Sequence, residues 1–218
     1  MTMSRWLRRL FALCVLRPVA IMMLGITVRG RENLPTSGPA IIVANHNSHL
    51  DTLVLLSLMP YRHIDIVRPV AAADYFLSNR YLAWFSLQIL NILPLERGNA
   101  ARGEDPLQES AAALDRGEIL IVFPEGSRGA AEIMGKFKGG VARLKERYPS
   151  VPVIPVFLQG AGKALPRGEI VLVPVVVDAV VGTEVPWTGN RAQYTAEMES
   201  AVRALGASLP KVFDDEED

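Results

Sequence analysis

The sequence predicts an α/β fold: a single domain with a mixed, largely parallel central sheet flanked by helices, preceded by an N-terminal membrane-associating helical segment. Three observations lead to this prediction. Near-continuous apolar runs such as residues 118–123 are typical of strands that are covered on both faces of a sheet. Such runs alternate with helical patterns, as they do in parallel βαβ units. A chain of 218 residues, half of them apolar, is long enough for one substantial core.

We expect three regions along the chain: membrane-anchoring helices at residues 1–30, the α/β domain at 31–212, and a disordered acidic tail at 213–218. The formal net charge of zero hides an asymmetry, because six arginines precede the first acid, Glu32, and five consecutive acids close the chain at residues 214–218. A single cysteine, Cys14, excludes an internal disulfide and a cysteine-based metal cluster. We expect it to be a small buried hydrophobic residue.

The amino-terminal region is largely apolar from residue 10 to 28, but Arg17 and Pro18 interrupt the run. A central arginine costs about 2.5–3.5 kcal/mol for insertion across a bilayer, and the proline would kink a spanning helix. We therefore expect two short helices joined near Arg17 and Pro18. Their apolar faces would enter one leaflet, on the cytoplasmic side, while the arginines meet anionic head groups. A kinked single span and a helix packed on the protein's own core remain as alternatives.

The first strand of the domain is expected at residues 40–44, which are all apolar and follow a turn-rich stretch at 31–39. An apolar helix is expected at residues 51–59. Either Asn47 or Ser48 could cap its amino end, because both side chains can accept hydrogen bonds from the first free N–H groups of a helix.

A second strand is expected at residues 63–70, where His63 alternates with isoleucines and is more simply a strand residue than a metal ligand. Residues 75–87 mix aromatic and aliphatic side chains at helical spacing, which predicts a helix. A short strand should follow at residues 91–97 and end in charged residues.

The remaining part of the domain begins with a helix at residues 106–116 that Gly117 ends. The strand at residues 118–123 then has the apolar character of a central position in the sheet. Two further apolar runs predict strands at residues 153–158 and 169–177.

A titratable pair follows the first strand: His46 lies just after it and Asp51 lies at the start of the next helix. Residues five apart are separated by about 140° on a regular helix, so the two would not face each other there. They meet only if His46 lies in the preceding turn and Asp51 in the first turn of the helix. The carboxylate could then fix the imidazole tautomer and stabilise its charged form. The simpler alternative is a helix-start acid beside an unrelated loop histidine.

A second polar group follows the strand at residues 118–123, where Gly126, Ser127 and Arg128 form a tight turn. Such a turn can present backbone N–H groups and a guanidinium to an anion. Arg97 follows another expected strand, and Lys138 adds flexible positive charge. With His46, these residues suggest a base that faces a phosphate or carboxylate pocket, although each cation alone could be a surface residue. No Walker or dinucleotide-binding pattern is present, and we expect no nucleic-acid partner.

Four blocks in this order carry a resemblance: His46 and Asp51 after an aliphatic strand, Arg97, Phe-Pro-Glu-Gly-Ser-Arg at residues 123–128, and the run at 151–156. Over residues 30–181 the chain resembles the glycerolphospholipid acyltransferase family, which includes the 1-acylglycerol-3-phosphate acyltransferases and other lysophospholipid acyltransferases. The resemblance implies that His46 is the catalytic base and Asp51 its partner. The substrate-binding residues that we predict are Arg97, Glu125, Gly126, Ser127, Arg128, Lys138 and Pro155. The resemblance implies that Arg97, Glu125, Gly126 and Arg128 lie in the acyl-acceptor site, with the arginines on phosphate, and that Pro155 helps to shape the acyl-donor site.

The implied reaction moves a fatty acyl group from acyl-CoA or acyl carrier protein to the free hydroxyl of a lysophospholipid. We expect 1-acylglycerol-3-phosphate as the acceptor and phosphatidate as the product, with no metal and no cofactor beyond the thioester. Another lysolipid acceptor, such as lyso-ornithine lipid, is an alternative. Two other classes stay open: a metal-dependent hydrolase that uses His46, His49 and Asp51, and a non-enzymatic protein that binds membrane lipids.

Overall fold

The apolar runs that predicted buried strands lie at the centre of the sheet. Strand β2 (Ala40–Ala44) pairs in parallel with β5 (Ile119–Val122) on one side and with β6 (Val153–Gln159) on the other. All residues of β2 are buried, because helices cover both of its faces. The computed structural model describes residues 3–23, 25–48, 50–73, 79–95, 105–127, 133–164 and 176–210.

Four shorter strands complete the sheet: β1 (Thr27–Arg29), β3 (Val67–Ala72), β4 (Leu93–Leu95) and β7 (Asp178–Val181). In the described part of the chain the strand order is β1-β7-β6-β2-β5-β3-β4. Neighbouring strands run parallel except for β6 and β7, which are antiparallel. The expected mixed, largely parallel sheet is therefore confirmed. The carboxyl ends of β2 and β5 lie at the same edge, so the turns that follow them are neighbours.

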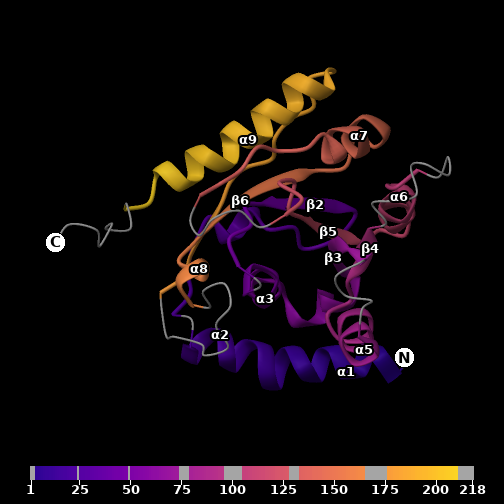
Figure 1. Ribbon diagram of the computed structural model, residues 1–218, viewed down its shortest axis with the longest axis vertical. Helices are drawn as coiled ribbons and strands as arrows, with labels where there is room; N and C mark the ends of the chain where they lie inside the picture. The colour runs from indigo at the N-terminus through magenta and orange to yellow at the C-terminus, as the bar shows by residue number, and fades with distance from the viewer. Residues whose placement is uncertain are drawn as a thin grey trace.

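Two helical layers cover the sheet, as Figure 1 shows. The layer drawn at the bottom of the view contains α1 (Met3–Phe11), α2 (Arg17–Met23), α3 (Leu50–Leu58) and α5 (Arg80–Gln88). The layer drawn at the top contains α7 (Gly140–Arg147) and α9 (Arg191–Ala207), with α6 (Gln108–Asp115) beside it. The side chains of β2 alternate between the two layers. Ile42 belongs to the core cluster that includes α3, and Ile41 and Val43 belong to the cluster that includes α9.

The amino-terminal helices follow one another directly, because a π-helical turn (Ala12–Leu16) joins α1 to α2. The junction therefore lies before Arg17 and Pro18 and not at them, since a proline is tolerated in the first turn of a helix. Helix α2 ends at Met23 and the sheet begins at Thr27, a few residues before the boundary expected at residue 30. None of the helices in the described residues is long and apolar enough to cross a membrane.

One face of this amino-terminal segment packs on the domain. Ala12 and Leu16 are buried in the core cluster that includes α3. The Arg8 Nε atom donates to the Gln88 carbonyl at 2.7 Å, and Arg9 forms an ion pair with Asp65 at 2.6 Å. The expectation that all the arginines point to lipid head groups is wrong for Arg8 and Arg9. Packing on the protein's own core and an exposed apolar face occur together in this segment.

The opposite face of the segment is apolar and exposed. Trp6 is 57 % exposed, Leu13 55 % and Met22 80 %, and Leu10 lies on the same face. Cys14 is exposed as well, so its expected burial is wrong. The cysteine lies on the side of the π-helical turn that faces away from the domain, whereas Ala12 and Leu16 face the core.

One of the expected strands begins later than its sequence pattern suggested, and another lies largely outside the described residues. Residues 61–66 form a 3-10 helix (Tyr61–Ile66), so His63 lies before β3 and not within it. In the run at 169–177, residues 169–175 lie outside the described residues and residues 176 and 177 precede β7. The acidic tail at 213–218 also lies outside the described residues. A second 3-10 helix (Arg31–Asn33) precedes β2, and a short helix, α8 (Ala161–Ala164), follows β6.

Among the described α-helices and strands, those without a counterpart among the expectations are β1, β7, α7, α8 and α9. Helix α9 carries a buried stripe of Tyr194, Met198 and Val202, spaced four residues apart as one face of a helix requires. Asn190 caps it, because the Asn190 side chain accepts hydrogen bonds from the N–H groups of Ala192 and Gln193.

Candidate active site

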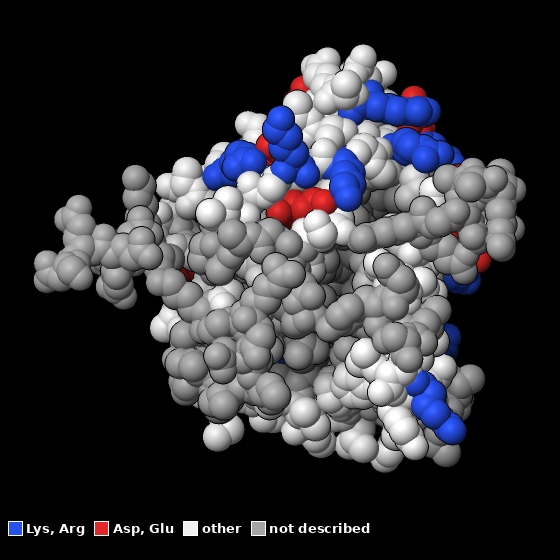
Figure 2. Space-filling view, viewed as in Figure 1, with Lys and Arg blue, Asp and Glu red and all other residues white. Residues whose placement is uncertain are grey.

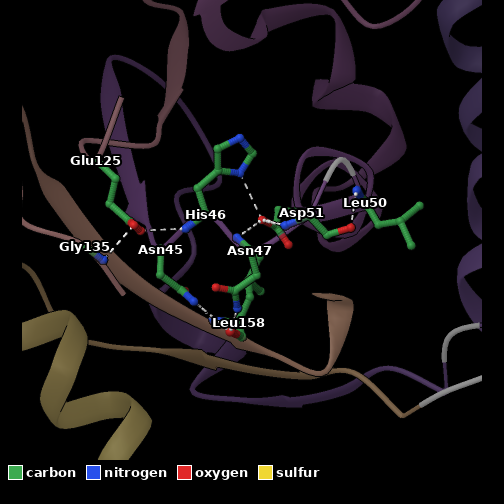
Figure 3. Close-up of polar contacts among 9 residues, drawn as sticks. Asn45, His46, Asn47, Leu50, Asp51, Glu125, Gly135 and Leu158 are labelled. Carbon is green, nitrogen blue, oxygen red and sulfur yellow. Dashed lines mark hydrogen bonds and ion pairs between the residues drawn. The ribbon is translucent and has the colours of Figure 1, made fainter. Parts of the chain in front are cut away.

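The turn between β2 and α3 brings His46 and Asp51 together (Figure 3). The His46 Nδ1 atom lies 3.0 Å from Asp51 Oδ2. His46 lies before the helix and Asp51 in its first turn, which is the arrangement that the spacing required. Asp51 is fully buried, and its Oδ2 atom also accepts from the N–H groups of Asn47 at 2.6 Å and Ser48 at 2.8 Å. Three donors thus hold one carboxylate oxygen.

This geometry assigns the histidine tautomer. An ionised carboxylate only accepts hydrogen bonds, so the Nδ1 atom of His46 must donate to Asp51, and the neutral ring then leaves Nε2 with a free lone pair. In Figure 3 this second ring nitrogen points away from Asp51. The imidazole stacks on the ring of Phe123, with centroids 4.2 Å apart and planes 21° apart. His46 is therefore a fixed, partly exposed base whose free nitrogen can take a proton.

Two asparagines that flank His46 attach the turn to β6. The Asn45 side chain donates to the Leu158 carbonyl at 2.8 Å and accepts from the Leu158 N–H at 2.7 Å. Asn47 donates to the same carbonyl at 3.1 Å. The amide of Asn45 thus imitates one more residue of strand pairing beyond the end of β2. The sequence prediction did not assign these roles, although a polar Asn directly after a wholly apolar strand is a visible signal.

Glu125 lies in the turn after β5 and reaches the His46 turn. Its Oε1 atom accepts from the His46 N–H at 2.8 Å, and its Oε2 atom accepts from the Gly135 N–H at 2.8 Å. The residue is only 6 % exposed. Both carboxylate oxygens are thus bonded to backbone, one on each side of the carboxylate in Figure 3. The sequence predicted a binding residue here, and the structure shows a connection between two loops.

Helix α9 secures the loop that carries Gly135. The Phe137 N–H donates to Glu199 Oε2 at 2.9 Å, and this bond lowers the pKa of Glu199. Arg203 donates to the carbonyls of Met134 and Gly135 at 3.2 and 3.4 Å. Layers on both faces of the sheet therefore contribute to the site, because Asp51 comes from α3 and the Gly135 loop is held by α9.

Gly126 and Lys138, both predicted to bind substrate, lie side by side. A Cβ atom at Gly126 would stand 2.6 Å from Lys138 Nζ, so a larger side chain would crowd the lysine. Gly126 also has a φ of 75°, in the left-handed region that favours glycine. The Lys138 N–H donates to the Pro124 carbonyl at 2.9 Å. Both residues line an open hollow of about 830 Å³. Ser127 is exposed next to Gly126.

Pro155 lies within β6 and is buried, and its ring lies 2.9 Å from where a Cβ atom of Gly182 would stand. Its register partner is Val43 of β2, three residues before His46. Arg97, Arg128 and His49 lie outside the described residues. Within the described residues, no group of three or more His, Cys, Asp or Glu side chains could hold a metal ion.

Comparisons with known proteins place this geometry in a family. The chloroplastic 1-acyl-sn-glycerol-3-phosphate acyltransferase BAT2 of Brassica napus is 33 % identical over 148 residues, 65 % of this chain and 39 % of that protein. A 1-acyl-sn-glycerol-3-phosphate acyltransferase of Chlamydomonas reinhardtii is 30 % identical over 192 residues, 85 % of this chain and 53 % of that protein. The chain thus spans about half or less of the length of these relatives.

The fold has a counterpart among solved structures. The crystal structure of the 1-acyl-sn-glycerophosphate acyltransferase PlsC from Thermotoga maritima superimposes with a TM-score of 0.70 at 22 % identity, over 95 % of this chain and 84 % of that one. The family model described as Acyltransferase matches residues 25–159, which include both the His46 turn and the Glu125 turn. This family model covers more than half of the sequence, so the chain belongs to the acyltransferase family.

Proposed function

We propose that this protein transfers a fatty acyl group from an acyl thioester to the free hydroxyl of a lysophospholipid. The observation that carries the proposal is the His46–Asp51 pair, which leaves Nε2 free beside the Glu125 turn. The names of the Brassica and Chlamydomonas relatives favour 1-acylglycerol-3-phosphate as the acceptor and phosphatidate as the product.

The reaction proceeds by direct attack. His46 Nε2 takes the proton from the acceptor hydroxyl while the hydroxyl oxygen forms a bond to the thioester carbonyl carbon. Asp51, held by two backbone N–H groups, keeps the ring in place and stabilises the imidazolium that forms. The tetrahedral intermediate then collapses, the carbon–sulfur bond breaks, and the leaving thiolate takes the proton from His46. The products are the acylated lipid and a free thiol.

The remaining predicted residues take separate parts. Arg97, Ser127 and Arg128 bind the phosphate of the acceptor, because guanidinium and hydroxyl groups suit phosphate oxygens. Glu125 positions the base through the His46 backbone, since its two oxygens are bonded to the N–H groups of His46 and Gly135. Pro155 contributes to the wall behind the acyl donor.

The same proposal places the protein on the cytoplasmic face of the cell membrane, held by the exposed side of the amino-terminal helices. Trp6 and Leu13 belong to this side. It continues onto α5, where Tyr81 and Trp84 are exposed and Phe85 makes an edge-to-face contact with Phe11. Exposed aromatic and aliphatic side chains on one surface are typical of proteins that enter one leaflet.

The test is an assay of thiol release from acyl-CoA and from acyl carrier protein thioester, each with a panel of lysolipids. We expect release that depends on the added lysolipid and is fastest with 1-acylglycerol-3-phosphate, with phosphatidate detected by mass spectrometry. Faster turnover of lyso-ornithine lipid would overturn the acceptor assignment. Thiol release that ignores every lysolipid would overturn acyl transfer itself.

A further inference from the structure

The open hollow beside Gly126 has a lining of one charge sign. Its described lining residues include three cations, Lys138, Arg143 and Arg191, and no acid. Leu95, Pro106 and Leu107 form an apolar part of its wall, and the first turns of α7 and α9 form another part. A concave surface with several cations and an apolar wall suits an organic molecule that carries phosphate.

The cations of the hollow keep donors available. Arg143 pairs with Asp105 at 3.3 Å, and Arg191 pairs with Glu146, but each carboxylate occupies only part of a guanidinium that has five N–H donors. No carboxylate in the described part of the chain pairs with Lys138. These groups would meet an anion without first breaking a buried ion pair.

Helix α7 adds to the positive potential of the hollow. It has no acid in its first turn, and its cap residue, Gly139, has no side chain that could bond the free N–H groups. At α9, by contrast, the Asn190 side chain already accepts two such bonds. The α7 end therefore supports the three cations of the hollow, which carry the argument.

The position of the hollow favours the donor, although Gly126 in its lining was predicted to lie in the acceptor site. It lies among α7, α9 and the start of α6, on the opposite side of the sheet from α1, α2 and α5 (Figure 1). Figure 2 shows lysines and arginines gathered over α7 and α9 in the upper part of the same view. A lipid acceptor in the membrane reaches the site from the apolar side, whereas a water-soluble carrier approaches from the charged side.

The hollow is also connected to the base. Gly126 lines the hollow and directly follows Glu125, whose carboxylate accepts the His46 N–H at 2.8 Å. A ligand that places phosphate on Lys138 and Arg143 therefore lies next to the turn that positions His46. A flexible arm attached to that phosphate could extend over Gly126 towards the base.

We propose that this hollow binds the phosphates of the phosphopantetheine carrier of the acyl donor, an inference that rests on the proposed acyl transfer. Coenzyme A and holo acyl carrier protein share this chemistry, because both present a phosphate at the end of a pantetheine arm. The hollow thus gives the donor an entry of its own, separate from the entry of the lipid acceptor.

The test measures binding of coenzyme A and of holo acyl carrier protein to the full chain by calorimetry, without turnover. Arg143→Gln and Lys138→Gln should each raise the dissociation constant about three- to tenfold, the loss expected for one charge-assisted phosphate contact. Arg116→Gln is the matched control, because Arg116 is 49 % exposed and paired with Glu118, much as Arg143 is 48 % exposed and paired with Asp105. The control should change neither constant.

Each outcome is informative. Weaker binding of both ligands by the two variants supports a shared phosphopantetheine site. Weaker binding of one ligand alone identifies that carrier as the donor. Unchanged binding of both, with melting temperatures intact, would overturn the proposal. A rise in the KM for the lysolipid with no change in donor binding would also overturn it, since the hollow would then be the acceptor's. Because binding needs no turnover, failure of acyl transfer would appear separately, as arginine-dependent carrier binding without product.

Discussion

The two helical layers pack on the same sheet but expose different kinds of side chain. One layer exposes apolar groups, and the other exposes charged groups. In the amino-terminal layer, Arg8 and Arg9 turn inward to bond the domain, while Trp6 and Leu13 face outward. In the α7 and α9 layer the order is reversed, because the apolar stripe that includes Tyr194 is buried and the arginines are exposed. Charge count alone therefore does not say which surface of a protein is basic, since that depends on which face of each helix packs on the core.

The site lies where the two layers meet. Asp51 comes from the layer that contains α3, and the Gly135 loop that bonds Glu125 is held by Glu199 and Arg203 of α9. An apolar approach and a charged approach to one base suit a reaction between a lipid and a water-soluble thioester. Substitutions in each layer test whether the two substrates reach the base from opposite sides of the sheet.

The largest effect is expected at the junction itself. His46→Ala should lower kcat by about 10²- to 10⁴-fold, the usual contribution of a general base. Binding to coenzyme A and to lipid vesicles should stay at the level of the unchanged protein, because neither surface includes the imidazole. Thiol-release kinetics and the two binding measurements check this. Substantial residual turnover would contradict the role of His46, and a loss of vesicle binding would contradict the separation of the layers.

A smaller effect is expected at Glu125, which connects the two loops. Glu125→Ala should lower kcat about 10- to 100-fold, because it leaves the buried N–H groups of His46 and Gly135 without their acceptor. Glu125→Gln keeps one acceptor oxygen and should recover part of that loss. Steady-state kinetics separate this from a binding role. A raised KM for the lysolipid with unchanged kcat would show that Glu125 contacts substrate.

The smallest effect is expected on the apolar surface. Leu10→Asp should weaken binding to vesicles of phosphatidylcholine and phosphatidylglycerol about tenfold, because Leu10 is 42 % exposed on the outward face. Ile133→Asp is the control, since Ile133 is 64 % exposed but lies beside Met134, which packs on the cluster that includes α9. Sedimentation with vesicles measures both. An equal loss in the two variants would mean that the membrane contacts neither layer in particular.

The part of the site that could be predicted from the sequence depends on short distances along the chain. His46 and Asp51 are five residues apart, so helix geometry alone predicts that they meet only if His46 lies before the helix and Asp51 lies in its first turn. The structure has this arrangement. The central strands were visible because burial on both faces requires an unbroken apolar run, as in β2.

The features that were not predicted depend on partners far away in the sequence or on weaker sequence patterns. The bond from Arg8 to Gln88 spans 80 residues, and nothing near Arg8 marks its inward direction. The partner of Glu125, Gly135, belongs to a loop without regular structure. Helix α9 is a different case, because Tyr194, Met198 and Val202 repeat at helical spacing after a capping Asn190, a signal that could have been used.

The pairing of Asn45 with Leu158 has a consequence for observing this protein in solution. The Leu158 N–H donates to a side chain of the His46 turn. Its exchange with solvent deuterium therefore requires that this turn first separate from β6. One backbone amide, 113 residues from Asn45 in the chain, becomes a spectroscopic reporter of whether the base is held in place.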